Sequence, residues 1–371
     1  MREPSSGMLA PERRVHILAA LARDGIVKVT SLSDELGVTP VTLRRDLAQL
    51  EVDGLVLRVH GGAIPAHESE VPETAVLPPV SVRPVAGRDA IGILVPSLNY
   101  YWPTVVRGAE QEAERLGYRL LIRGASYELQ DERPLLERLV EEDGVVGLIV
   151  APNTAAEHAD EVLEWLHRAP VPAVLVEREG RGPDLSPMES ASSDHALGGM
   201  LAARHLAALG HERIALVLSR SSPTSGQVAA GWSEACRELG LPESTGVAAH
   251  LPDRNSPDFS SVVAATLDDA LQHGVTGMLV HPDPEALAFV DVAMTRGISV
   301  PEDLSVIAYD DEVARMFTPA FTAVAPPRTA VGRTAVGLLH RRITEPDVSV
   351  ERAKLSPSLS VRASTAPPRT V

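Results

Sequence analysis

Cysteine is almost absent from this 371-residue chain, which contains only Cys236 and therefore cannot form an internal disulfide. A lone thiol is typical of a reducing compartment and excludes the small disulfide-stapled secreted folds. Long hydrophobic runs are missing too, since stretches such as Val145–Ala151 reach only seven residues, far below the ~18–20 that span a bilayer. The polar beginning, Met1–Glu12, does not look like a signal peptide. These absences predict a cytoplasmic protein with no membrane partner.

Motifs that assemble catalytic or cofactor sites are also missing. The sequence contains no GxSxG, GxGxxG, GxxxxGK[ST], HExxH or CxxC pattern. His281 has no companion at metal-ligand spacing, and Cys236 lies in a helical pattern that favours a buried structural thiol. We therefore expect a protein that is not an enzyme and that uses no cofactor and no metal.

Charge is unevenly distributed along the chain. Residues 1–65 contain eight Lys and Arg and eight Asp and Glu, whereas the remainder contains 26 against 42 and carries the whole net charge of −16. Such an acidic bulk disfavours non-specific binding to nucleic acid. A small neutral module can still dock on DNA through a few well-placed arginines. The asymmetry indicates a boundary between two kinds of domain.

A proline-rich stretch separates these two parts. Residues 64–88 include five prolines among Ser, Glu and Ala and lack an apolar period, as a semi-extended linker does. The chain is 44% hydrophobic and 23% charged, which is ordinary for globular domains. We expect a small head at 1–64, a linker at 65–88 and a larger domain at 89–365.

After the linker, apolar segments alternate with amphipathic helical patterns. Strands that are apolar on both faces and separated by helices predict parallel sheets in an α/β fold. The strands divide around residues 180–193 into two Rossmann-like lobes, the first about 89–190 plus 326–345 and the second about 191–322 plus 350–365. Ligands of such folds bind at the carboxyl ends of the strands, so we expect a site between the lobes. The predicted strands are Ile91–Pro96, Arg119–Gly124, Gly147–Pro152, Pro172–Glu177, Arg213–Ser219, Val247–Leu251, Gly277–His281 and Leu304–Tyr309.

The head has the pattern of a helix-turn-helix followed by a wing. A first helix is predicted over Pro11–Arg23, and a short second helix ends in a glycine turn. Thr39 then caps a third helix whose apolar positions, Leu43, Leu47 and Leu50, recur at helical spacing and face a core. The string LVLRVHGG that follows suits a strand and a tight turn. The order of these elements predicts DNA binding.

The strings RRDL at Arg44–Leu47 and HGGA at His60–Ala63 carry a specific resemblance, because the head is similar to the DeoR-type winged helix. The resemblance implies that the third helix reads the major groove of double-stranded operator DNA and that the wing contacts the backbone. Alternatively, Arg44 and Arg45 form a solvated helix face, with one arginine paired to Asp46 or Glu51. The residues expected at the DNA are Thr39, Val41, Thr42, Arg44, Arg45, Arg58 and His60.

The larger domain resembles the effector domain of the lactose-repressor (LacI) family over about residues 90–365. The resemblance is carried by the string HLAALGHERIA at His205–Ala215 and by VPEDLSVIAYDD at Val300–Asp311. It implies a two-lobed, periplasmic-binding-protein-like domain that closes on a small polar effector such as a sugar. The hinge-helix motif of that family is absent, because the proline-rich linker and the DeoR-type head stand in its place.

Polar and aromatic residues that follow strands are the candidates for binding the effector. A sugar needs hydrogen-bond partners for its hydroxyls and a flat apolar face for its ring. Three residues have simpler alternatives, because Asp194 could only cap its helix, Asp310 could only form a turn, and Tyr100 could pack between the lobes. The candidates are Asn99, Tyr101, Trp102, Glu177, Asp194, Arg220, Asp283 and Asp310.

Three departures from the LacI pattern bear on the ligand. The family's usual arginine falls on Val228, its Asn-Asp pair appears as Pro282-Asp283, and a polar residue of the returning strand falls on Pro326. The loss of a bidentate donor at Val228 weakens the case for a simple pyranose, although Arg220 could compensate. The acidic lining suits a ligand with an amine, or a nucleoside, equally well.

The sequence therefore predicts a transcriptional regulator, by default a repressor, whose operator binding is modulated by a sugar-like effector. We expect a homodimer, because one recognition helix reads too few base pairs for genomic specificity. The alternatives are a solute-binding protein or a sugar-acting α/β protein without a regulatory role. Whether the effector induces or co-represses stays open.

Overall fold

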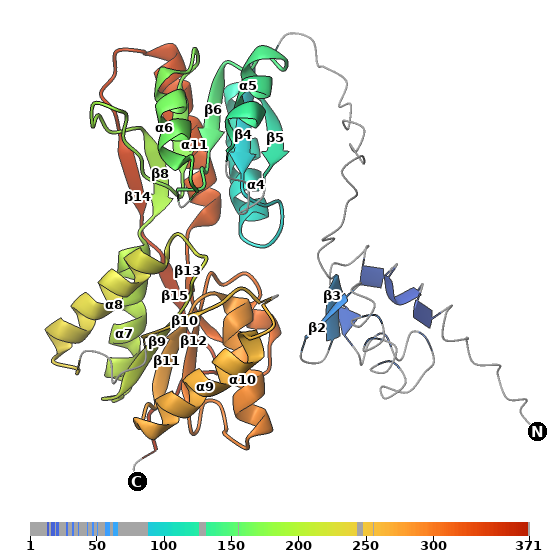
Figure 1. Cartoon of the computed structure of the whole chain (residues 1–371), viewed down its shortest axis with the longest axis vertical. Helices are drawn as coiled ribbons and strands as arrows, with labels where there is room; N and C mark the ends of the chain where they lie inside the picture. The colour runs from blue at the N-terminus through green and yellow to red at the C-terminus, as the bar shows by residue number, and fades with distance from the viewer. Residues whose placement is uncertain are drawn as a thin grey trace, which may run out of the picture. The chain divides into compact units, whose positions relative to one another are not determined.

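The computed structural model describes residues 88–125, 131–154, 156–242, 248–254 and 256–369, together with parts of residues 13–65 (Figure 1). The chain forms two compact units, Met1–Pro84 and Val85–Val371. The boundary lies inside the proline-rich stretch. None of the described helices is long and apolar enough to cross a membrane.

The head unit contains a three-stranded antiparallel sheet packed on a small apolar core. Its strands are ordered β1-β3-β2, with β1 at Val27–Lys28, β2 at Val56–Val59 and β3 at Gly62–Pro65. The antiparallel strands β2 and β3 pair as far as Val59 with Gly62, at the place where the sequence predicts a wing. The predicted core positions Leu43, Leu47 and Leu50 are buried together with Ile17 and Leu21.

The residues expected to contact DNA fall almost entirely outside the described part of the head. The structure describes the backbone of Arg58, which lies in β2. The others, Thr39, Val41, Thr42, Arg44, Arg45 and His60, lie outside the described residues.

The first lobe is a parallel sheet with helices on both faces (Figure 1). In β4, Ile91, Ile93 and Val95 belong to one apolar cluster, whereas Ala90 and Leu94 belong to another, so alternate residues face opposite layers. The sheet order is β14-β8-β7-β6-β4-β5, formed by β4 (Ala90–Val95), β5 (Arg119–Gly124), β6 (Gly147–Val150), β7 (Ala173–Val176), β8 (Ser190–Ser193) and β14 (Arg352–Leu355). The helices are α4 (Trp102–Leu116), α5 (Arg133–Glu141), α6 (Ala159–Arg168) and α11 (Arg328–Thr344).

The second lobe repeats this architecture, with one antiparallel strand at the edge of an otherwise parallel sheet. The sheet order is β10-β9-β11-β12-β13-β15, formed by β9 (Ile214–Ser219), β10 (Ala248–Leu251), β11 (Gly277–Val280), β12 (Ser305–Tyr309), β13 (Thr322–Ala325) and β15 (Ser358–Ser360). The helices are α7 (His195–Ala208), α8 (Ser225–Leu239), α9 (Phe259–Gln272), α10 (Asp283–Thr295) and the 3-10 turn η1 (Ala314–Met316).

The chain crosses between the lobes three times, after β8, after β13 and between β14 and β15. The two-lobed α/β fold is thus confirmed, and each predicted strand has a counterpart. One prediction is wrong in part. The sequence predicts that residues 350–365 belong to the second lobe; β15 does, but β14 pairs in parallel with β8 of the first sheet. Exposed and half-buried residues alternate along β14, which lies at the edge of the sheet. Its short polar sequence does not indicate a strand at this place.

Two helix pairs approach each other through glycines. An alanine Cβ at Gly332 of α11 would lie 2.0 Å from the carbonyl oxygen of Val105 in α4, and one at Gly108 would lie 2.2 Å from that of Thr329. In the second lobe, a Cβ at Gly231 of α8 would lie 1.8 Å from the carbonyl oxygen of Ala196 in α7. The helix backbones are therefore in direct contact at these points, which leaves no room for a side chain.

Candidate functional site

Polar side chains from both lobes, most of them buried, meet at the carboxyl ends of their strands. Tyr100 follows β4 and Glu177 follows β7 in the first lobe, while His281 follows β11 and Asp310 follows β12 in the second. This is the edge of an α/β sheet at which ligands bind. We call these four residues, together with Tyr101, His195, Tyr309 and Arg328, the inter-lobe polar cluster.

A hydrogen bond between Tyr100 and Asp310 joins the two lobes. The Tyr100 hydroxyl donates to Asp310 Oδ2 at 3.2 Å, and Asp310 is only 4% exposed. Burial raises the pKa of Asp310 to about 6, although the charge of Arg328 and the Tyr100 hydrogen bond oppose the shift. Burial also raises the pKa of Tyr100 well above its usual value, so its hydroxyl keeps the proton that it donates.

Glu177 is the most fully satisfied acid of the cluster. Its carboxylate accepts hydrogen bonds from the Tyr101 hydroxyl at 2.6 Å and from the Ser193 backbone N–H and hydroxyl at 2.9 and 2.8 Å. His195 Nε2, at the start of α7 in the second lobe, lies 3.4 Å from Glu177 Oε2. Burial alone would raise the pKa of Glu177, but hydrogen bonding to His195 and its charge outweigh burial and lower it. Glu177 is therefore ionised and forms a second link between the lobes.

Three ring side chains of the second lobe, His195, Tyr309 and His281, lie next to one another beside Glu177. His195 Nδ1 lies 3.0 Å from the Tyr309 hydroxyl, and the His281 ring packs edge-on against Tyr309 with centroids 5.0 Å apart. Gly198 makes room for this hydroxyl, since a Cβ there would lie 2.3 Å from it. Burial lowers the pKa of His281 to about 3, so its imidazole is neutral. Its Nδ1 has no hydrogen-bond partner within the described part of the chain.

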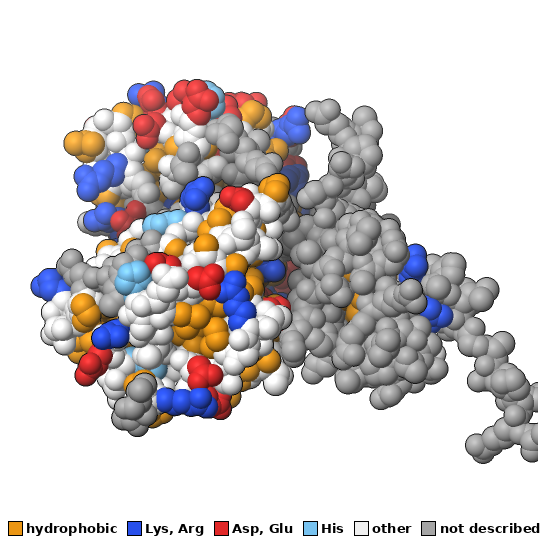
Figure 2. Space-filling model, turned by 60° about the horizontal axis from the view of Figure 1, so that its bottom comes forward, with side chains coloured by type: hydrophobic (Ala, Val, Ile, Leu, Met, Phe, Trp, Pro, Cys, Tyr) orange, Lys and Arg blue, Asp and Glu red, His pale blue; other side chains and the backbone are white. Residues whose placement is uncertain are grey.

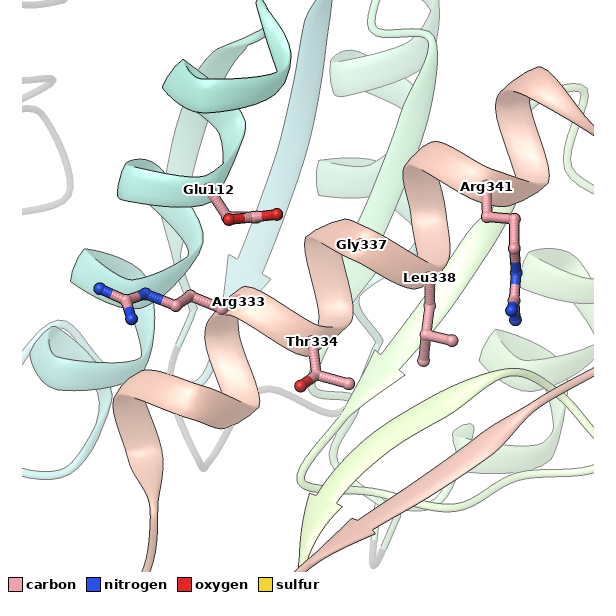
Figure 3. A pocket seen from close by; sticks show the side chains of 6 residues that line it. All are labelled: Glu112, Arg333, Thr334, Gly337, Leu338 and Arg341. Carbon is pink, nitrogen blue, oxygen red and sulfur yellow. The ribbon is translucent and has the colours of Figure 1, made fainter.

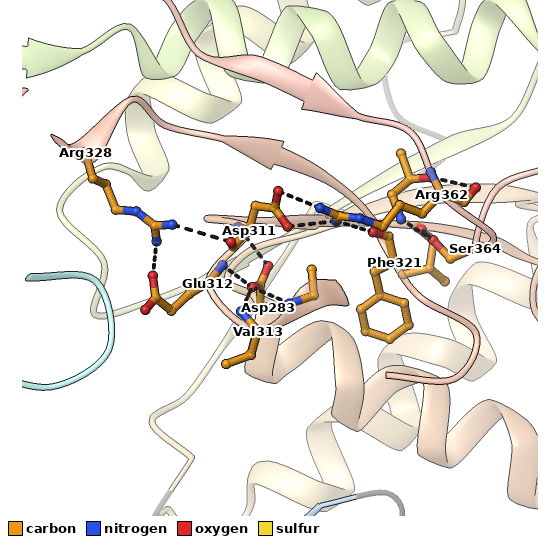
Figure 4. Close-up of polar contacts among 11 residues, drawn as sticks. Asp283, Asp311, Glu312, Val313, Phe321, Arg328, Arg362 and Ser364 are labelled. Atoms are coloured by element: carbon orange, nitrogen blue, oxygen red, sulfur yellow. Dashed lines mark hydrogen bonds and ion pairs between the residues drawn. The ribbon is translucent and has the colours of Figure 1, made fainter. Parts of the chain in front are cut away.

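Arg328 provides a cation at the same place (Figure 4). It begins α11, and its Nη1 lies 2.6 Å from Glu312 Oε2 of the second lobe. Its Nη2 donates to the backbone carbonyl of Asp311 at 3.4 Å, and its guanidinium carbon lies 5.4 Å from the centroid of the Tyr101 ring. Arg328 therefore ties the first-lobe helix to the loop after β12.

Asp283 organises the loop after β12 (Figure 4). It is fully buried, and its carboxylate accepts hydrogen bonds from four consecutive backbone N–H groups at 2.8–3.3 Å, those of residues 311–314. Arg362 holds Asp311 from the other side through two hydrogen bonds of 2.7 and 2.8 Å. Both oxygens of Asp283 are thus engaged, so a ligand hydroxyl would have to compete with this loop.

The structure brings together three of the residues predicted to bind the effector, namely Tyr101, Glu177 and Asp310. Trp102 does not present its ring as predicted, because α4 begins at this residue and turns the side chain into the core of the first lobe, where it is 2% exposed. Asp194 follows its simpler alternative, since its carboxylate accepts the Leu197 N–H and caps α7. Of the remaining three, Asn99 and Arg220 are exposed, and Asp283 binds the loop after β12.

Tyr100, Tyr309, His195, His281 and Arg328 were not among the predicted binding residues. The backbone marks the site independently, because four of the five described non-glycine residues with left-handed φ lie at it. They are Tyr100 (53°), Glu177 (55°), Asp310 (95°) and Asp311 (51°). Such conformations cost free energy and persist where the surrounding structure demands them.

Glu285, in the first turn of α10, is a further buried acid that the sequence did not single out. It is 6% exposed, and its Oε2 has no hydrogen-bond partner among the described residues. Burial raises the pKa of Glu285 to about 7; the charge of Arg254 opposes this shift, and those of Asp310 and Asp253 add to it.

The raised pKa of Glu285 makes stability depend on pH. The pKa of Glu285 is higher in the folded protein than in the unfolded chain. Its contribution to the free energy of unfolding is therefore fully present at a pH below the unfolded-state pKa. This contribution is lost as the pH rises through the folded-state pKa of about 7. We expect Glu285→Gln to raise the free energy of unfolding of the ligand-free protein by about 3 kcal/mol at pH 8 and by less than about 1 kcal/mol at pH 5. Urea denaturation at both pH values measures this. The exposed Glu302→Gln serves as control, and a Glu285→Gln effect that is equal at both pH values would contradict the assignment.

A pocket of about 380 Å³ lies away from this cluster, on the first lobe (Figure 3). It is lined by α4 and α11 residues, and contains none of the predicted effector residues. The lining residues are Glu112, Arg333, Thr334, Gly337, Leu338 and Arg341.

Comparisons with known proteins agree with this architecture. Residues 203–365 match the periplasmic binding protein-like domain, and residues 13–69 match the DeoR-like helix-turn-helix domain. An uncharacterised HTH-type transcriptional regulator of Streptomyces limosus is 32% identical over 74% of this chain and 78% of its own length. The HTH-type transcriptional regulator DegA of Bacillus subtilis is 28% identical over 80% of this chain and 87% of its own.

The crystal structure of a LacI family transcriptional regulator from Enterococcus faecium, with bound ribose, superposes with a TM-score of 0.61. It is 27% identical and covers 75% of this chain and 99% of its own length. The two α/β lobes and the similar regulators point to the same family. The chain therefore belongs to the LacI-type HTH transcriptional regulators and carries a DeoR-like head.

Proposed function

We propose that the chain is a repressor that binds operator DNA through its head as a homodimer, and that a small polar effector bound between the lobes sets its affinity for DNA. The observation that carries this proposal is the inter-lobe polar cluster, in which Tyr100 donates a hydrogen bond to Asp310 and His195 Nε2 lies 3.4 Å from Glu177 Oε2 across the two lobes. A ligand that replaces these contacts between the lobes with hydrogen bonds of its own can shift the lobes relative to one another.

The chemistry of the cluster favours a ligand with several hydroxyls. Asp310 and the ionised Glu177 accept hydrogen bonds, and Arg328 and Tyr101 donate them. The similar Enterococcus faecium regulator holds ribose. A sugar or a related metabolite is therefore the ligand class that we propose.

Coupling to DNA follows from the three chain crossings between the lobes. A ligand changes an equilibrium only through its different affinity for the two states. Because the cluster links side chains of both lobes, a ligand there has different contacts in open and closed arrangements. The same crossings carry the change to the first lobe, from whose sheet the chain leads back to the linker and the head.

We assign DNA contact to the head and not to the effector domain. On the face seen in Figure 2, the acidic and basic side chains of the described residues are interspersed and form no continuous basic surface. Phosphate binding needs such a surface or a module with well-placed arginines. The wing strands β2 and β3 belong to such a module in the head. The proposed role is binding and regulation, not catalysis.

A thermal-shift screen of the full chain against sugars, sugar phosphates and nucleosides tests the effector site. A ligand at a hundredfold excess over its Kd adds about 2.7 kcal/mol to stability, which raises the melting temperature by a few degrees. We expect Asp310→Asn to lose this shift because it removes the charge that faces Tyr100 and Arg328. Asp347→Asn, at an exposed position, should keep it. A shift that survives in Asp310→Asn places the ligand elsewhere and refutes the proposed site.

A further inference from the structure

We propose that the effector carries a positively charged amine, which Glu285 and Asp310 bind between them. This inference rests on the proposed function of the same site and specifies the chemistry of its ligand. The observations that support it are an unpartnered buried oxygen of Glu285 and the burial of both carboxyl groups at the same strand ends.

The unpartnered oxygen belongs to Glu285. This side chain is 6% exposed, yet its Oε2 has no hydrogen-bond partner among the described residues. A buried polar atom without a partner costs free energy, and native structures keep few of them. Glu285 stands two residues after Asp283, whose carboxylate accepts hydrogen bonds from the backbone of residues 311 and 312, directly after Asp310. The helix that carries it follows β11, the strand next to β12 in the sheet. This placement puts Glu285 at the same strand ends as Asp310. A ligand donor at this point would satisfy Oε2.

Glu285 lies among other charged groups. Burial raises its pKa, the charge of Arg254 lowers it, and the charge of Asp310 at the end of β12 raises it further. The Arg254 guanidinium lies over the Phe259 ring at 6.0 Å. A cation bound here would favour the ionised forms of Glu285 and Asp310 together.

Arg328, the cation that acts on Asp310, is held by an acid of its own. It pairs with Glu312 at 2.6 Å. Among the described side chains, neither Glu285 nor Asp310 forms an ion pair with an arginine or lysine. An ammonium group would supply both the missing charge and the missing donors.

Val228 of α8 is fully buried in the apolar core of the second lobe. An ammonium group brings N–H donors of its own to the two carboxyl groups. Binding of a cation would also lower the pKa values of Glu285 (about 7) and Asp310 (about 6), so it should release protons near neutral pH.

Matched pairs of ligands test the inference on the full chain. The amines are glucosamine, galactosamine, mannosamine and 1-amino-1-deoxysorbitol, each measured by calorimetry at pH 7 against its parent hydroxyl compound. We expect at least one amine to bind the wild type at least tenfold more tightly than its parent and to release protons, as judged from two buffers of different ionisation enthalpy. Glu285→Gln, which keeps the shape but removes the charge, should abolish this preference, and the exposed Glu302→Gln should retain it.

The outcomes separate this inference from the proposed function. If no amine binds the wild type more tightly than its parent, the inference is overturned. If the parent sugars bind in that case, the proposed function stands on its own. A preference that persists in Glu285→Gln also overturns the inference, because it assigns the amine to other groups. The proposed function fails separately if ligands that bind the chain leave its affinity for DNA unchanged.

Discussion

Replacing Gly332 with alanine is expected to lower the free energy of unfolding of the effector domain by about 3 kcal/mol. The added Cβ would lie 2.0 Å from the carbonyl oxygen of Val105 and 2.7 Å from the backbone nitrogen of Ala109. Both atoms belong to the backbone of α4, which cannot move aside as a flexible side chain can. The two helices would have to separate along their whole contact, where Gly108 makes the reciprocal approach at 2.2 Å from Thr329.

The same helix offers a matched control at Gly337. No described atom lies within 4 Å of a Cβ built there, so Gly337→Ala should stabilise the domain by about 0.5–1 kcal/mol through helix propensity alone. Helix α8 of the second lobe offers the same comparison. Gly231→Ala should destabilise the domain because its Cβ would meet the backbone of Ala196, and Gly226→Ala, where no described atom lies within 4 Å, is its control. Guanidinium denaturation of the four variants measures the effect. Equal losses at Gly332 and Gly337 would show that the close approach is not what makes glycine necessary.

Replacing Arg44 and Arg45 together with alanine is expected to weaken operator binding by about a hundredfold or more. Each arginine that contacts a phosphate or a guanine edge contributes roughly 1–3 kcal/mol. These residues lie outside the described part of the head, so the expectation rests on the third-helix pattern and the RRDL string. A gel-shift titration on DNA enriched from the genome by the wild-type chain measures the change.

The control for this variant removes the same charge elsewhere. Arg168→Ala with Arg237→Ala deletes two arginines of the effector domain whose side chains are each 66% exposed. This control should bind DNA as the wild type does. The two single variants then separate the roles, because loss of a phosphate contact weakens all sequences alike and lowers the salt dependence, whereas loss of a base contact relaxes specificity. Wild-type affinity in the Arg44 and Arg45 double variant would place the DNA contact elsewhere.

Most of the fold could be predicted because buried parallel strands have a clear sequence pattern. Segments such as Gly147–Val150 and Gly277–Val280 are short apolar runs between helices, and each lies in a sheet as expected. Strand β8 escaped prediction, since Ser190–Ser193 is fully buried but consists of three serines and one alanine, without an apolar run. Strand β14 escaped for the opposite reason, because its residues are partly exposed at the sheet edge and its partner lies some 160 residues earlier in the chain.

The site was predictable where a simple rule applies and not where contacts are distant. Glu177 and Asp310 follow strands, and strand ends gather at one edge, so position alone indicated them. Tyr101 and Trp102 are adjacent aromatics, and only the start of α4 decides that Trp102 turns into the core. The link of Arg328 to Glu312 depends on a crossing between lobes that local sequence does not encode.

The most direct test of the account is the DNA affinity of the full chain with and without its ligand. Fluorescence anisotropy on the enriched operator would be measured in the presence of the compound that gives the largest thermal shift, for the wild type and for Asp310→Asn. We expect saturating ligand to change the wild-type Kd for DNA at least tenfold, a coupling of about 1.4 kcal/mol, and to leave the Kd of Asp310→Asn unchanged. A wild-type chain that is saturated with ligand but binds DNA with an unaltered Kd would contradict the account.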